Sequence, residues 1–124
     1  MIIARDELLQ KQRDLLVRFA MAYIHTARLF NQVAADPGNR PEVLQMIIKH
    51  IFIKDPELLK AVAPHWEWVA EDGMPNVDSV IKQQDHWADV FKLLEAKTSQ
   101  ARLFDLDIAR EANRRLAAES PFRA

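Results

Sequence analysis

The sequence contains no cysteine and only two glycines. Without cysteine the chain has no disulfide framework, no thiolate metal site and no cysteine nucleophile. Two glycines that lie far apart cannot build the glycine-rich loop that holds phosphate in nucleotide-binding proteins. Signals for β-hairpins are also missing, because Asp72-Gly73 has no strand-like residues around it. These absences favour a mostly helical protein.

A charge excess of one sign is absent too. Lys and Arg number 17 and Asp and Glu number 18, so the formal net charge is -1. A dedicated nucleic-acid-binding domain normally carries a basic excess, and we therefore expect no nucleic-acid partner.

Long apolar runs are also lacking. The densest one, MIIKHIFI, is interrupted by Lys49 and His50, whereas a membrane span needs about 18–20 apolar residues. We therefore expect no membrane insertion. At the N-terminus four apolar residues are followed at once by Arg5, Asp6 and Glu7, which does not match an export signal. If the chain is a complete gene product, this pattern predicts a cytoplasmic protein.

The residue types that carry chemistry do not fall into catalytic patterns. The four histidines show no His-x-x-x-His or Glu-x-x-His spacing, and no serine has the surroundings of a nucleophile elbow; they are His25, His50, His65 and His86. We interpret His25, beside an apolar helix face, as a partly buried and hydrogen-bonded side chain. We predict no enzyme activity, no metal, no cofactor and no catalytic residue.

The sequence does contain a helical pattern. Its 124 residues are 49% hydrophobic and 28% charged, a length and composition typical of one globular domain over residues 1–124. The longest pattern spans Arg13 to about Ala35. Its apolar residues recur at helical spacing, namely Leu16, Phe19, Ala20, Tyr23, Ala27, Phe30 and Ala34. Val17, Met21 and Ile24 widen this arc, which predicts a helix covered on more than one side.

The next two helices are marked by proline. One begins near Asn39 or Arg40 with Pro41 in its first turn, and its inward stripe is expected to be Leu44, Ile47, Ile48 and Ile51, broadened by Val43 and Met46. The other begins with Asp55 as a cap and Pro56 at its first position, and ends before Pro64.

Two further helices complete the pattern. Asn76 is expected to cap a helix that runs to about Glu95, with an apolar stripe of Val77, Val80, Ile81, Trp87 or Ala88, Phe91 and Leu94. The last helix spans about Asp107 to Ala118. With a short helical turn at Asp6–Lys11 and a candidate strand at Met1–Ala4, the fold class is mostly α, an irregular bundle of about five helices.

The stretch Glu71–Trp87 gathers a glycine turn, amides and aromatic residues, and it is either a binding site or a joint. Large rings beside a loop more often pin the loop to the core than line a pocket; the candidates are Trp66, Trp68 and Trp87. Gln83 and Gln84 face solvent or bond the loop backbone. We interpret the stretch as a joint, and Arg114-Arg115 near the end as a solvated face rather than a docking site.

Three segments in this order resemble the C-terminal part of a known family: IIARDELLQKQRDLLVRFAMAYIHTARLFNQ, NRPEVLQMIIKHIFIKDPELLKAV and DGMPNVDSVIKQQDHWADVF. The family is the nitrate/sulfonate/taurine-type substrate-binding proteins of ABC transporters. These share their fold with thiamine-pyrimidine-synthase-like proteins, in the type II periplasmic-binding-protein superfamily. The resemblance covers nearly the whole chain and lies in order and spacing, since no matching motif is catalytic.

The resemblance implies a periplasmic parent protein with two α/β lobes that close on a small molecule and then dock on an ABC permease. Met1–Ala4 would end a strand of one lobe, and the following helices would wrap that lobe. Most of the pocket would come from segments before Met1, so no ligand-binding residue is carried over. We therefore expect a partial substrate-binding protein, for a small nitrogen or sulfur compound or a thiamine-precursor-like pyrimidine, that binds little ligand alone.

Helices that covered a sheet would leave an apolar face open without it. At about 25 cal/mol per Å², a face of several hundred Å² favours association by several kcal/mol before entropy costs. We therefore expect a homodimer through an exposed apolar helix face. The alternative function is a freestanding, self-associating, all-helical interaction module.

Overall fold

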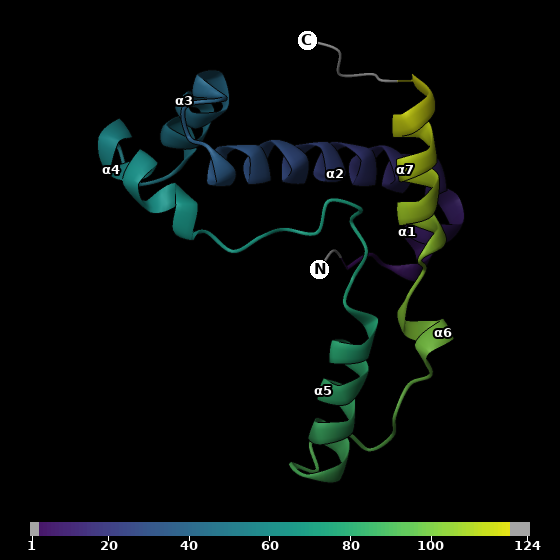
Figure 1. The fold of residues 1–124 in the computed structure, drawn as a ribbon. Coiled ribbons are helices and arrows are strands. Elements are labelled where there is room, and N and C mark those ends of the chain that lie inside the picture. Colours follow the sequence, from purple (N-terminus) through teal and green to yellow (C-terminus); the bar gives the residue numbers. More distant parts are fainter. Residues whose placement is uncertain (1–2, 120–124) are drawn as a thin grey trace.

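The computed structural model describes residues 3–119, and these residues form helices and connecting segments without a strand. Figure 1 shows one long central helix with shorter helices at both ends. In chain order the elements are α1 (Asp6–Lys11), α2 (Arg13–Ala35), α3 (Pro41–His50), α4 (Pro56–Val62), the 3-10 turn η1 (Ala63–His65), α5 (Val77–Asp89), α6 (Gln100–Leu103) and α7 (Asp107–Glu119). The mostly α, irregular bundle is confirmed.

The candidate strand at Met1–Ala4 is not formed in its described half. Ile3 and Ala4 have no regular structure, and Met1 and Ile2 lie outside the described residues. A strand needs a neighbouring strand to pair its backbone groups, and residues 3–119 offer none.

The predicted helix starts are confirmed. Pro41 and Pro56 occupy the first positions of α3 and α4, where proline loses no hydrogen bond. The Asp55 side chain accepts hydrogen bonds from the backbone N–H groups of Glu57 and Leu58. The Asn76 side chain caps α5 by accepting a hydrogen bond from Ser79 N at 3.0 Å.

The core follows the two faces of α2. At its N-terminal half, α7 packs on one face, where Val17, Ala20, Met21 and Ile24 enclose Ala112. At its C-terminal end, α3 and α4 pack on the other side, in a second cluster of Val33, Val43, Leu44 and Leu59. The expectation that α2 is covered on more than one side is therefore confirmed. The Ile24 face is buried from Val17 to Ala34, whereas the opposite face is buried only near the C-terminal end of the helix.

The centre of the buried face of α2 differs from the expected one. Val17, Met21 and Ile24, expected at its edge, are buried, whereas Phe19 is 54% exposed. Small residues explain the shift, because Ala20 and Ala112 let α2 and α7 approach closely. In α3 the expected stripe is confirmed, because Leu44 is buried and Ile47, Ile48 and Ile51 pack against the same cluster as Val43. Met46, which was expected to broaden that stripe, is 53% exposed.

Helix α5 stands apart from this body. Figure 1 shows it below α2, joined to the rest of the chain by a connection at each end. No residue of α5 is buried. It ends at Asp89 instead of near Glu95, because the chain turns there and Lys92 adopts a left-handed φ of 54°.

Candidate functional site

The stretch between η1 and α5 lies along α2 and is held there by a buried amide. Asn31 is 0% exposed. Its Nδ2 donates to the Val69 carbonyl at 2.7 Å and to Glu71 Oε1 at 3.0 Å, while its Oδ1 accepts from Val69 N at 3.0 Å. Asn31 thus satisfies the backbone of residue 69 on both sides, as a neighbouring strand would. We call residues 66–76 the strap.

Two more polar side chains hold the strap between α2 and α7. Arg28 donates to the Glu71 carbonyl and to Asn113 Oδ1, at 3.2 and 3.0 Å. Asn113 Nδ2 in turn donates to the Asp72 carbonyl at 2.7 Å. The sequence does not reveal these three anchoring side chains, since an asparagine or arginine on a helix carries no pattern that identifies its distant partner.

Gly73 packs directly against the Ile24 side chain of α2. Its φ is +67°, and a Cβ at this position would lie 2.8 Å from Ile24 Cγ1. Both facts require glycine, because other residues resist this φ and the Ile24 side chain is fixed in the core. The predicted turn at Gly73 is formed, because Glu71 and Asp72 adopt a turn that the hydrogen bond from Gly73 N to the Ala70 carbonyl closes. The interpretation of the stretch as a joint stays a prediction.

The aromatic residues that were candidates for a pocket have separate positions. Trp66 stacks on Phe30 with ring centroids 4.8 Å apart and belongs to the core. Trp68 is exposed, and Trp87 lies on α5 with 41% of its surface open. The Trp66 ring pins the start of the strap to α2, as predicted, whereas the other two rings do not pin a loop to the core.

Of the two paired glutamines, one bonds the loop backbone and the other faces solvent. Gln84 bonds the loop backbone, donating to the Thr98 carbonyl at 3.0 Å and accepting from Thr98 N at 2.9 Å. Gln83 is exposed.

Among the described residues, the histidines form no metal site with neighbouring carboxylates. The His86 ring meets Phe91 edge-on, with ring centroids 4.8 Å apart. No group of three or more His, Asp or Glu side chains within residues 3–119 is arranged to hold a metal ion.

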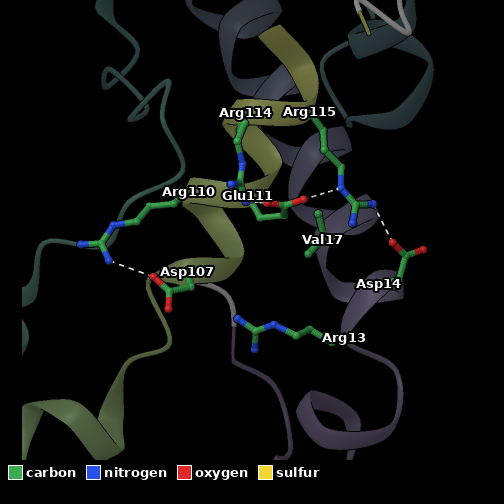
Figure 2. A pocket seen from close by; sticks show the side chains of 8 residues that line it. All are labelled: Arg13, Asp14, Val17, Asp107, Arg110, Glu111, Arg114 and Arg115. Carbon is green, nitrogen blue, oxygen red and sulfur yellow. Dashed lines mark hydrogen bonds and ion pairs between the residues drawn. The ribbon is translucent and has the colours of Figure 1, made fainter. Parts of the chain in front are cut away.

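A charged groove lies where α7 crosses the N-terminal half of α2, and Figure 2 shows the side chains around it. It encloses about 670 Å³ over a floor that includes Val17. Its walls carry four arginines and three carboxylates: Arg13, Arg110, Arg114 and Arg115 with Asp14, Asp107 and Glu111.

These charges are matched within the protein. Arg115 bridges the two helices by bonding Asp14 on α2 and Glu111 on α7, at 2.6 and 2.8 Å. Arg114 also pairs with Glu111, Arg110 with Asp107, and Arg13 with Asp105, which lies just before α7. Four guanidinium groups therefore face four carboxylates. The groove is electrically balanced. The Arg115–Asp14 pair fastens α7 to α2, and the Arg13–Asp105 pair fastens α2 to the segment just before α7, whereas the other pairs lie within α7.

The contact between Arg13 and Asp105 shifts the pKa values of both side chains. The Arg13 guanidinium donates two hydrogen bonds to Asp105, at 2.6 and 3.2 Å. These bonds lower the pKa of Asp105 and raise the pKa of Arg13. Both shifts favour the charged pair, as a structural ion pair requires. Arg115 belongs to this fastening rather than to a merely solvated face.

Among the described residues, exposed apolar side chains gather on α2 and on α5. On α2, Leu15, Phe19 and Ala22 lie on the face opposite Ile24 and are exposed; helical spacing puts them in line with Leu29 and Val33, which α3 and α4 cover. We call these three residues the outer stripe. On α5 and the turn after it, the open residues are Trp87, Val90, Phe91 and Leu93, which we call the α5 patch.

Comparison with protein-family models, curated proteins and solved structures finds no match for this chain. Within the described residues, no helix combines the length and the apolar character needed to cross a membrane.

Proposed function

We propose that this chain is a helical part of an ABC-transporter substrate-binding protein, for a small nitrogen or sulfur compound or a thiamine-precursor-like pyrimidine. In this role it supports a lobe and does not hold the ligand by itself. The proposal starts from the sequence resemblance to the nitrate/sulfonate/taurine-type family. The structural observation that supports it is the pair of open apolar surfaces, the outer stripe and the α5 patch.

Open surfaces of this kind are expected where helices cover another part of a folded protein. Scattered exposed apolar residues are normal, but the outer stripe continues a row that is buried further along α2. In addition, α5 has only 13 residues, and isolated helices of this length are marginal in water. Both elements therefore have the character of surfaces that pack against something else.

The charged groove supports the proposal that the chain does not hold the ligand by itself. Sites for small molecules are mostly apolar, with a few convergent polar groups. The groove instead has charged walls whose arginines and carboxylates bond one another. A neutral or singly charged nutrient would meet charged groups that are already paired with one another, so we expect the chain alone to bind such ligands weakly or not at all.

Measuring the size of the native product tests the proposal. An antibody against this chain, used on an extract of the native cells, should detect a protein more than twice as long as the 124-residue chain. Detection of only a 14.3 kDa product would contradict it and would favour the alternative, a freestanding helical interaction module. Calorimetry adds a second check, because micromolar binding of taurine, nitrate or a pyrimidine to the isolated chain would show that the ligand site is here.

A further inference from the structure

The two open apolar surfaces belong to the same chain but cannot cover each other within it. The outer stripe lies on α2 in the body, whereas the α5 patch is on a helix that projects away from the body (Figure 1). Within residues 3–119, α5 has no extensive packing partner among the other helices. Each surface is thus one half of a helix–helix contact without its other half.

We infer that the chain on its own forms a two-fold dimer in which the α5 patch of each copy packs on the outer stripe of the other. The inference concerns the isolated 124-residue chain and does not rest on the transport role. A two-fold axis makes the contact occur twice, so both surfaces of both copies are covered at once.

The outer stripe is suited to receive a helix because it continues an existing helix interface. Leu29 and Val33 on the same face already pack against α3 and α4. Leu15, Phe19 and Ala22 extend that row at i, i+4 and i+7 toward the N-terminus of α2, which is the spacing of a helix-packing ridge. A helix laid beside α3 on this face would therefore meet the same kind of surface.

The area available approaches what a stable dimer needs. Six large apolar side chains of the two surfaces are between 41% and 70% exposed: Leu15, Phe19, Trp87, Val90, Phe91 and Leu93. They leave on the order of 500–600 Å² of apolar surface open in each copy, which is most of the roughly 800 Å² per partner buried in a specific interface.

A pair of charge-introducing variants tests the inference. Analytical ultracentrifugation at tens of micromolar should give a dimer for the natural chain. Phe19→Asp and Trp87→Asp should each raise the dimer dissociation constant at least tenfold. Met46→Asp, at an equally exposed apolar side chain outside both surfaces, is the matched control and should leave the dimer intact. Unchanged helical circular dichroism confirms folding, and Val90→Asp replaces Trp87→Asp if that variant unfolds.

Mixing the two variants distinguishes this geometry from other dimers. A Phe19→Asp copy has an intact α5 patch, and a Trp87→Asp copy has an intact outer stripe. The mixture should therefore recover one of the two contacts and dimerise more tightly than either variant alone. A monomeric natural chain, a dimer that neither variant weakens, or a mixture no tighter than its components would overturn the inference. None of these results bears on the native size that tests the transport role.

Discussion

Two side-chain amides make the same pair of hydrogen bonds in two differently supported regions of the molecule. Asn31, in the body formed by α2, α3, α4 and α7, holds both backbone groups of Val69 from a fully buried position. Gln84, on the projecting α5, holds both backbone groups of Thr98 from a partly exposed one. Because the hydrogen bonds are alike and only the burial of the two amides differs strongly, comparing them shows how much of their stabilising effect depends on the surrounding packing.

The largest contrast is expected from shortening an isoleucine in each region. Ile24→Ala removes a side chain that is 0% exposed between α7 and the strap, and should lower the free energy of unfolding by about 2–5 kcal/mol. Ile81→Ala shortens a side chain of α5 that is only partly buried, and should cost less than about 1.5 kcal/mol. Urea denaturation of both variants provides the measurement. Equal losses would mean that α5 is packed as firmly as the body.

The amides themselves should show the next largest difference. Asn31→Ala leaves the buried backbone groups of Val69 and the Glu71 side chain without their partner, so it should cost about 2–3 kcal/mol. Gln84→Ala removes the hydrogen bonds to the backbone groups of Thr98 at a partly exposed position, where water can replace the amide. It should lower the free energy of unfolding by about 1 kcal/mol or less. Chemical denaturation measures both values. A Gln84 variant as unstable as the Asn31 variant would refute the role assigned to burial.

The same comparison shows what the sequence could and could not predict. Caps and proline positions are local signals, so Asp55, Pro56 and Asn76 were placed correctly at their helix starts. The centre of the buried face of α2 was misplaced, because large Phe19 looked more suited to the core than small Ala20. Which face of α2 is buried depends on α7, because Ala112 of α7 packs against Ala20 of α2. The sequence of α2 alone does not show which helix packs against it.

The polar anchors of the strap were missed for a related reason. Asn31 bonds Val69, and Asn113 bonds Asp72, from positions that are 38 and 41 residues away along the chain. An asparagine in a helix is uncommon inside a core, because it competes with the helix backbone for hydrogen bonds. Its position at i+4 from Ala27 on the buried face was the one signal that could have identified Asn31.

Helix caps provide a smaller and more local test. Asn76→Ala and Asp55→Ala each remove one capping side chain, at about 1 kcal/mol. We expect the Asp55 change to lower global stability, since α4 carries the buried Leu59. The Asn76 change should instead increase hydrogen exchange in α5 with little effect on global unfolding. Faster exchange in both α5 and α2 after the Asn76 change would show that the two helices unfold as one unit.

The smallest expected effect concerns the pH dependence of the ion pair between Arg13 and Asp105. Hydrogen bonds from Arg13 lower the pKa of Asp105, so the folded protein binds a proton there less readily than the unfolded chain. The pair therefore stabilises the fold above the ordinary aspartate pKa of about 3.9, and this contribution is lost as the pH falls through the lower, folded value. Because both side chains are partly exposed, it should be below about 1 kcal/mol.

Urea denaturation of the natural chain and of Asp105→Asn, from about pH 7 down to about pH 2.5, isolates this contribution. The difference in unfolding free energy between the two proteins should be constant above about pH 5 and should shrink below about pH 4. Asp89→Asn is the matched change in the α5 region, where Lys97 lowers the pKa of Asp89 at a more exposed position. If α5 is less firmly packed than the body, the Asp89 change should alter global stability less than the Asp105 change at every pH. The reverse order would place the stronger electrostatic fastening on the projecting helix, and would contradict the division of the molecule into a packed body and a less firmly packed α5.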